Sequence, residues 1–405
     1  MEKKFTMHEQ LAKTSGKSIG LNNRPSQSEM EQVLAVFAQQ RYVEAEVLGR
    51  AMTASHPRFG MGWMLLGAIL KKLQRHADAL AAQSRAAELL PDDAEVHYNL
   101  GNTLLQLGRA YDAECSYRHV LAINPAYVEA HYNLGVATQQ QEKFDEAESS
   151  YRATLSSHPE FAQAHSNLGI VLSSLERFAE AEASFRRAVD LTPDDAQAHY
   201  NLANILACLQ RHADAETEYR TAVEIQPQFH EARCSLANTL RDQERHNEAE
   251  AAYREVIASR PAYTDAYFHL GDSLMSQKRA EEAELCYRQV LVLNPELVEA
   301  HNHLGVSLKK QGRFADAEAN FRKALELRPD FASAHNNLGN TLHDQDRIAE
   351  AEGCYRQAIK FNPDYAEAFS NLGNTLKSEG RLDEARDALE RAIDLKPDFV
   401  EPHFG

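Results

Sequence analysis

The chain has 405 residues, of which 43% are hydrophobic and 25% are charged, a composition typical of a folded soluble protein and not of a disordered one. Lys and Arg number 43 against 60 for Asp and Glu, and the net charge of −17 argues against nucleic-acid binding. The chain has no apolar run long enough to span a bilayer, and its N-terminus lacks the apolar stretch of a secretory signal. We therefore expect a cytoplasmic protein with no nucleic acid and no membrane as partner.

Prolines set a repeat of 34 residues that runs through most of the chain without an insertion. A short fixed period predicts a solenoid, in which each unit is too small to bury its own apolar face and stacks on its neighbours. We number each unit so that this proline is position 32. The prolines are Pro57, Pro91, Pro125, Pro159, Pro193, Pro227, Pro261, Pro295, Pro329, Pro363 and Pro397.

The first segments of the chain depart from this pattern. Residues 1–25 are polar and belong to no unit, so we expect a flexible N-terminal tail. Residues 26–59 keep the proline but carry Gln32-Val33 and Gly49 where later units have a Leu-Gly pair and an aromatic residue. We interpret residues 26–59 as a degenerate capping repeat.

Residues 60–399 contain ten full units, each of which predicts a helical hairpin. Apolar or small residues recur at positions 4, 7, 8 and 11 and again at 20, 24 and 27, which is a 3.6-residue period in two blocks. Position 20 is alanine in every unit, from Ala45 to Ala385, so two helices are expected to cross closely there. Positions 7 and 8 are Leu followed by Gly or Ala, and position 24 is mostly Tyr or Phe.

These columns resemble the tetratricopeptide repeat (TPR), whose pattern is Trp-x-x-Leu-Gly-x-x-Tyr, then Ala-x-x-x-Phe, then Pro. Trp63, Leu66-Gly67, Ala79 and Pro91 give one unit in that register, and the resemblance covers about nine-tenths of the chain. It implies an all-α fold, a solenoid of stacked helical hairpins that forms a right-handed superhelix. By the same resemblance, the first helices of the hairpins would line a concave groove.

Position 19 is acidic in every unit, from Glu44 to Glu384. These residues fall in the first turn of the second helix, where a carboxylate stabilises the unpaired amide groups and the positive end of the helix dipole. We therefore interpret much of the negative charge as part of the scaffold. A binding site for basic partners is the alternative.

Two rows of asparagine, at positions 6 and 9, lie on the side of the first helix opposite its apolar face. A carboxamide both donates and accepts hydrogen bonds, so such rows could hold an extended peptide backbone whatever its side chains. The alternative is a structural ladder in which the amides of adjacent repeats bond one another. The predicted peptide-binding residues are Asn99, Asn102, Asn133, Asn167, Asn201, Asn204, Asn238, Asn337, Asn340, Asn371 and Asn374.

Position 2 adds a predicted acidic rim that would favour neutral or basic segments. The rim residues are Glu95, Glu129, Gln163, Gln197, Glu231, Asp265, Glu299 and Glu367. The stacked asparagines also resemble the arm of O-linked N-acetylglucosamine transferases, in which such a ladder holds the protein substrate and feeds it to a glycosyltransferase domain. Here the row is interrupted by Leu65, Ser235, His269 and His303, so a weaker or different grip is expected there.

Histidine recurs at position 4, on the apolar face, where it replaces the tryptophan of the pattern. We expect these rings to pack between helices with one edge bonded, because a zinc site would need three or four ligands. The five cysteines are widely spaced and are predicted to be reduced thiols. No catalytic or nucleotide-binding motif is present, so we predict no cofactor, no metal and no enzyme activity in these residues. The histidines are His97, His131, His165, His199, His301 and His335, with His403 in the fragment that follows.

Residues 400–405 begin a twelfth unit and then stop, which would leave Leu389, Ile393 and Leu395 of the last hairpin uncovered. Continuation of the natural chain into a downstream domain, pairing with another copy in a homo-oligomer, and fraying all stay open. Two functions follow from the sequence. The first is an interaction scaffold that binds extended or unstructured protein segments, and the alternative is the non-catalytic substrate-recognition arm of a larger glycosyltransferase.

Overall fold

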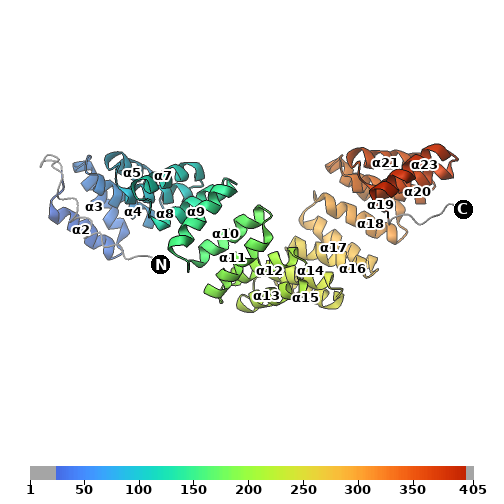
Figure 1. Cartoon of the computed structure of the whole chain (residues 1–405), viewed down its shortest axis with the longest axis horizontal. Coiled ribbons are helices and arrows are strands. Elements are labelled where there is room, and N and C mark those ends of the chain that lie inside the picture. Colours follow the sequence, from blue (N-terminus) through green and yellow to red (C-terminus); the bar gives the residue numbers. More distant parts are fainter. Residues whose placement is uncertain (1–23, 398–405) are drawn as a thin grey trace. The chain divides into compact units, whose positions relative to one another are not determined.

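The structure, a computed structural model, describes residues 24–397 (Figure 1). In this range the chain contains 22 helices and the turns between them, which confirms the all-α prediction. The chain divides into two compact units, Met1–Pro193 and Asp194–Gly405. Residues 1–23 of the predicted tail and the predicted twelfth unit at 400–405 lie outside the described residues.

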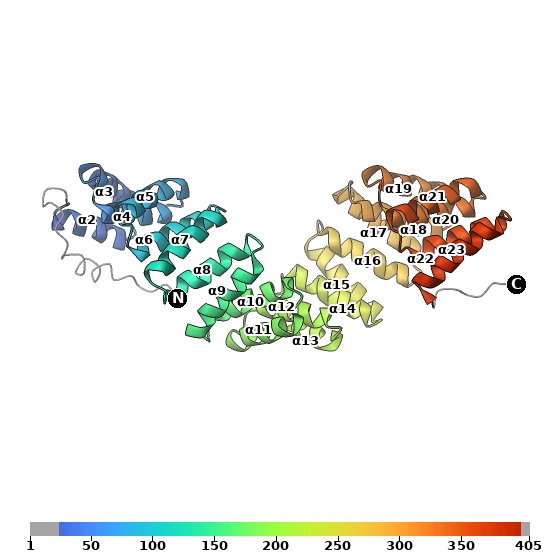
Figure 2. The same cartoon turned by 45° about the horizontal axis from the view of Figure 1, so that its top comes forward.

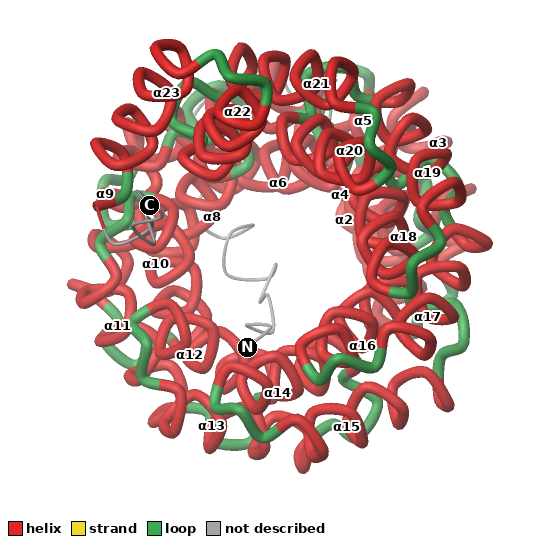
Figure 3. Tube along the Cα trace, turned by 90° about the vertical axis from the view of Figure 1, so that its right-hand side faces the viewer, coloured by secondary structure: helices red, strands yellow, loops and turns green. Residues whose placement is uncertain are grey.

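Both units are built from helical hairpins stacked in chain order, as the repeat predicts (Figure 2). Within each unit, the even-numbered helices form one layer and the odd-numbered helices form the other (Figure 3). We call these the first-helix layer and the second-helix layer. The helices of the unit Met1–Pro193 are α2 (Gln27–Ala38), α3 (Tyr42–Ser55), α4 (Gly60–Lys72), α5 (His76–Leu89), α6 (Ala94–Gln106), α7 (Ala110–Ile123), α8 (Val128–Gln139), α9 (Phe144–Ser157), α10 (Ala162–Ser174) and α11 (Phe178–Leu191).

The unit Asp194–Gly405 repeats the same arrangement. Its last helices leave Leu389, Ile393 and Leu395 only partly buried. The helices are α12 (Ala196–Cys208), α13 (His212–Ile225), α14 (His230–Asp242), α15 (His246–Ser259), α16 (Thr264–Ser276), α17 (Ala280–Leu293), α18 (Val298–Lys310), α19 (Phe314–Leu327), α20 (Ala332–Asp344), α21 (Ile348–Phe361), α22 (Ala366–Ser378) and α23 (Leu382–Leu395).

The two small-residue columns have different packing roles. The alanine at position 20 is fully buried in nearly every repeat, as at Ala113 and Ala317, because helices cross closely there. The glycine at position 8 instead makes room for the aromatic ring at position 24 of its own hairpin. A Cβ atom on Gly101 would lie only 2.7 Å from Cε1 of Tyr117, so a larger side chain would push the second helix away.

The histidines at position 4 confirm the prediction of a packed ring with one bonded edge. Nε2 of His131 lies 2.9 Å from the carbonyl oxygen of Pro125, six residues earlier. His97, His165, His301 and His335 make the same contact with their own prolines. Trp63, the one tryptophan, donates its indole N–H to the carbonyl of Pro57 at 3.0 Å. Histidine and tryptophan are therefore interchangeable donors that fix the turn between repeats.

Ion pairs join the second helices of consecutive repeats, an arrangement that the sequence analysis did not anticipate. Arg177 pairs with Glu148 of α9 at 2.6 Å and with Glu180 of α11 at 2.8 Å. Arg152 pairs with the same two carboxylates at 2.8 and 3.0 Å, so the four side chains form a closed ring of ion pairs. The position-19 acids therefore connect repeats as well as starting helices. The same ring recurs around Arg75, Arg245, Arg279, Arg347 and Arg381.

Candidate peptide-binding face

The asparagines at position 9 are acceptors for buried tyrosine hydroxyls. The ring of Tyr117 passes beneath Gly101, and its hydroxyl donates to Oδ1 of Asn102 at 2.8 Å. Burial raises the pKa of Tyr117, so the hydroxyl stays protonated and needs an acceptor. The tyrosines of three other repeats donate in the same way to Asn204, Asn238 and Asn340, at 2.5–2.9 Å.

The residue type at position 9 correlates with the residue type at position 24 of the same repeat. Tyr287 is opposite Asp272 and donates to its carboxylate at 2.7 Å, whereas Phe185 and Phe321, which have no hydroxyl, are opposite Ile170 and Val306. Where position 9 cannot accept, as at Val136, the hydroxyl of Tyr151 reaches Gln139 instead, at 2.7 Å. The position-9 amides are therefore required by the packing of the hairpin.

Asn374 departs from this rule because Leu389 occupies its position 24. It is exposed, and nothing among residues 24–397 bonds its carboxamide. The other ten predicted asparagines are partly buried.

Four of the six asparagines at position 6 use the carboxamide in the opposite way, because they donate from nitrogen to position 5 of the preceding repeat. Asn133 donates to the Tyr98 hydroxyl at 3.2 Å, and Asn167 donates to the Tyr132 hydroxyl at 3.1 Å. In the second unit, Asn337 and Asn371 donate to the Oδ1 atoms of Asn302 and Asn336, each at 3.0 Å. These four asparagines therefore form hydrogen bonds between consecutive repeats, as the alternative of a structural ladder predicts.

Three position-6 sites differ in detail. Asn133 makes a second donation, to Oδ1 of Asn102 at 2.8 Å, and so links the two rows. Asn201 accepts from Gln197 of its own helix at 2.9 Å. Asn99 lies beside the carboxylate of Glu95.

These bonds orient the two rows with opposite polarity. Asn204, Asn238 and Asn340 are held by their oxygens, and no described residue accepts from their side-chain N–H groups, whereas Asn102 also bonds Tyr98. Asn167, Asn337 and Asn371 are held by nitrogen, and no described residue donates to their Oδ1 atoms. The first-helix layer therefore presents fixed N–H donors from one row and fixed carbonyl acceptors from the other.

The predicted acidic rim is weaker than the sequence alone indicates. In the second unit, Glu299 pairs with Arg328 at 2.5 Å, and Glu231 and Glu367 each have a basic partner 29 residues later within 3.6 Å. Burial opposes ionisation of Glu299, but the bond from Arg328 holds the pKa below its usual range. In the first unit, burial raises the pKa of Glu95, which accepts the Tyr127 hydroxyl at 2.9 Å. Few rim carboxylates are left to attract a basic ligand.

Imidazole and carboxylate replace the amides at the interruption of the row. His303 contacts Oδ1 of Asp272 through Nδ1 at 2.8 Å, and its ring lies 4.9 Å from that of Phe268. Burial opposes ionisation of Asp272, but the His303 bond holds the pKa of that carboxyl low. Burial lowers the pKa of His269, whose Nδ1 is buried with no partner in the described part of the chain. This stretch has a different chemistry from the amide rows.

The comparison with family models decides the family. The tetratricopeptide repeat model matches residues 132–195, 167–228, 234–298 and 302–366. Further tetratricopeptide repeat models match residues 67–108, 94–127 and 366–399. The chain belongs to the tetratricopeptide repeat family. TPR domains generally bind other proteins and are typically non-catalytic.

Solved structures with similar folds include three proteins of low identity. Yeast Tom70 is 15% identical with a TM-score of 0.47, covering 91% of each chain. The APC/C hetero-tetramer Cut9–Hcn1 is 13% identical with a TM-score of 0.49, covering 91% of this chain and 93% of that one. MamA is 21% identical with a TM-score of 0.37, covering 40% of this chain and 95% of that one. No curated protein matches the chain, so the family assignment rests on the repeat models.

The finer resemblance, to the arm of O-linked N-acetylglucosamine transferases, is not among these findings and stays a hypothesis. Within residues 24–397, no group of three His, Cys, Asp or Glu side chains is placed to hold a metal ion. In the same part of the chain, no helix has both the length and the apolar character needed to cross a membrane. The asparagine rows are therefore the candidate site that the following proposal uses.

Proposed function

We propose that this TPR chain is an interaction scaffold that binds extended segments of other proteins along the first-helix layer. The observation that carries the proposal is the opposite polarity of the two asparagine rows. An extended peptide presents alternating N–H and C=O groups, and the rows offer an acceptor for one and a donor for the other. Recognition of this kind depends on the peptide backbone and tolerates many side-chain sequences.

The hydrogen bonds within the fold strengthen this proposal. A free asparagine side chain loses rotational freedom when it binds, which reduces affinity. Here the Asn167 and Asn204 carboxamides are already fixed by Tyr132 and Tyr219 before any ligand arrives. The structural ladder and the binding site are thus compatible, because one end of each amide is hydrogen-bonded within the fold and the other end can bond a ligand.

The partner is expected to be uncharged or only weakly charged along the bound stretch. In the second unit, Glu231, Glu299 and Glu367 of the rim are paired with bases, and position-19 acids such as Glu180 belong to ion-pair rings on the other layer. The asparagines of the two rows carry no formal charge. We therefore expect binding that depends little on salt concentration.

The test is a peptide selected from a displayed random library on the full chain, with the Kd measured for wild type and for the Asn133→Ala, Asn167→Ala pair. Loss of several backbone contacts should weaken binding about tenfold or more. Ser149→Ala, on the second-helix layer of the same unit, is the control and should leave the Kd unchanged. Equal affinity of the asparagine pair and wild type for every selected peptide would overturn the proposal.

A second hypothesis is that the chain is the substrate-recognition arm of a larger glycosyltransferase. It is motivated only by the position-6 asparagine row and its resemblance to that arm. The chain should then bind acceptor proteins of the transferase but transfer no sugar from UDP-N-acetylglucosamine by itself. Turnover by these 405 residues would contradict the hypothesis.

A further inference from the structure

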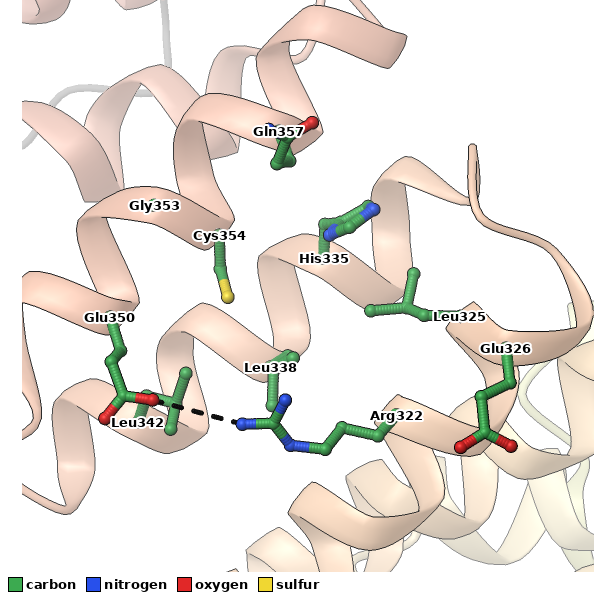
Figure 4. A pocket seen from close by; sticks show the side chains of 10 residues that line it. All are labelled: Arg322, Leu325, Glu326, His335, Leu338, Leu342, Glu350, Gly353, Cys354 and Gln357. Carbon is green, nitrogen blue, oxygen red and sulfur yellow. Dashed lines mark ion pairs between the residues drawn. The ribbon is translucent and has the colours of Figure 1, made fainter.

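A crevice of about 550 Å³ lies between α19, α20 and α21, on the second-helix layer of its unit (Figure 4). Its apolar lining comes from Leu325 of α19, Leu338 and Leu342 of α20, and Cys354 of α21. Burial raises the pKa of the Cys354 thiol, so this group stays neutral and behaves as a small apolar side chain. The volume is within the usual range for sites that hold a ligand.

The same repeat positions form a matched crevice three repeats earlier, between α13, α14 and α15, with a volume of about 330 Å³. There, Arg233 and Glu255 form an ion pair that joins two of the lining residues. In the larger crevice the equivalent residues are His335 and Gln357, which carry no such pair. A ligand in the larger crevice therefore does not have to break an ion pair at these two positions.

Gly353 is a further difference between the two crevices, because Ala251 takes its place in the smaller one, as Ala252 does for Cys354 and Val223 for Leu325. A Cβ atom on Gly353 would meet nothing within 4 Å, so no neighbour requires a glycine there. Glycine in the middle of a helix is less stable than alanine. The position thus gives up helix stability and leaves open space above the backbone, as expected where another molecule approaches closely.

The charged side chains around the crevice already have partners. Arg322 pairs with Glu318 at 2.8 Å and with Glu350 at 4.0 Å, and Glu326 pairs with Lys323 at 3.0 Å. His335 is held by the Pro329 carbonyl at 2.9 Å. A charged ligand group would have to compete with one of these pairs, whereas an uncharged apolar group would not.

We propose that the crevice between α19, α20 and α21 anchors one apolar side chain, a leucine or a methionine, of a partner protein that docks on the second-helix layer. This surface is distinct from the asparagine rows. The chain would then have two protein-binding faces, one that holds a peptide backbone and one that recognises an apolar side chain.

The test uses a displayed library of random peptides, selected on the full chain and then compared on four variants. Gly353→Leu fills the space above the helix, and it should fold at least as well as wild type because it removes a helix glycine. Peptides that use the crevice should bind Gly353→Leu about tenfold or more weakly, and should lose the same affinity when their leucine or methionine is changed to alanine. Gly353→Ala should keep most of the affinity.

Two control variants separate this proposal from the asparagine groove. Ala251→Leu fills the smaller crevice, and the Asn133→Ala, Asn167→Ala pair removes two amides of the asparagine rows. Neither variant should change the Kd of these peptides. The proposal is overturned if no selected peptide distinguishes wild type from Gly353→Leu, or if the peptides that do are anchored by a charged residue. Sensitivity of the same peptides to the asparagine pair would also overturn it, because they would then be groove ligands.

Discussion

The two asparagine rows of the first-helix layer use the same side chain in opposite ways. At position 9 the oxygen is bonded, as in Asn204 under the Tyr219 hydroxyl, and at position 6 the nitrogen is bonded, as in Asn167 beside Tyr132. The difference teaches that a recurring polar residue on a helix face is not by itself evidence of a ligand. Only the donor and acceptor atoms that are not already bonded within the fold can form hydrogen bonds with a ligand.

The largest expected effect is on stability at position 9. Asn238→Val leaves the hydroxyl of Tyr253 buried without an acceptor, which should lower the free energy of unfolding by about 1–3 kcal/mol. Denaturant titration followed by circular dichroism measures this change. Asn374→Val is the matched control, because Asn374 faces a leucine and has no buried hydroxyl to satisfy. If Asn374→Val lowers the free energy of unfolding as much as Asn238→Val does, position 9 does not stabilise the fold by accepting the tyrosine hydroxyl.

A double substitution sharpens the same comparison. Asn204→Ile alone should be destabilising, but adding Tyr219→Phe recreates the natural pairing of Phe185 with Ile170 and removes the unsatisfied hydroxyl. We expect the double variant to recover roughly 1 kcal/mol relative to Asn204→Ile. A double-mutant cycle on the free energy of unfolding measures this coupling. Strict additivity of the two substitutions would contradict the account.

The smallest expected effect concerns pH at position 6. Burial lowers the pKa of His269 below its unfolded value of about 6.5, although Asp272 and Asp265 act in the opposite sense and Arg241 assists burial. The stability from neutral His269 is fully present above that value and is lost as pH falls through the folded pKa. We expect wild type to lose up to about 1 kcal/mol more than His269→Asn between pH 7.5 and 5.5. Thermal melts at the two pH values make the comparison, and equal losses would mean that His269 does not contribute.

Most of the fold was predictable because the repeat is so regular. The proline spacing and the Ala45-to-Ala385 column are enough to predict stacked hairpins, and the structure confirms both the helices and their pairing. The ion-pair rings were also available in the sequence, since Glu148, Arg152 and Arg177 belong to columns of fixed charge. A single charged column does not predict them, because the rings depend on which columns of consecutive repeats lie side by side.

The candidate site was predictable only in part. Pairing column 9 with column 24 would have shown that Asn102 accompanies Tyr117 whereas Ile170 accompanies Phe185, and would have assigned position 9 a packing role. The polarity of the rows was not predictable, because it depends on which end of each carboxamide meets a neighbouring repeat. The crevice at Gly353 was not predictable either, since a sequence does not show whether neighbouring side chains fill the space beside a glycine.

The most direct test of the account is the affinity of a groove-binding peptide before and after N-methylation of its backbone. If the rows hold the peptide through its N–H and C=O groups, methylating alternate backbone nitrogens should weaken the Kd about tenfold or more. Changing the side chains at the same positions to alanine should alter the Kd only about twofold. The reverse result, with affinity kept after methylation and lost with the side chains, would contradict recognition of the backbone by the asparagine rows.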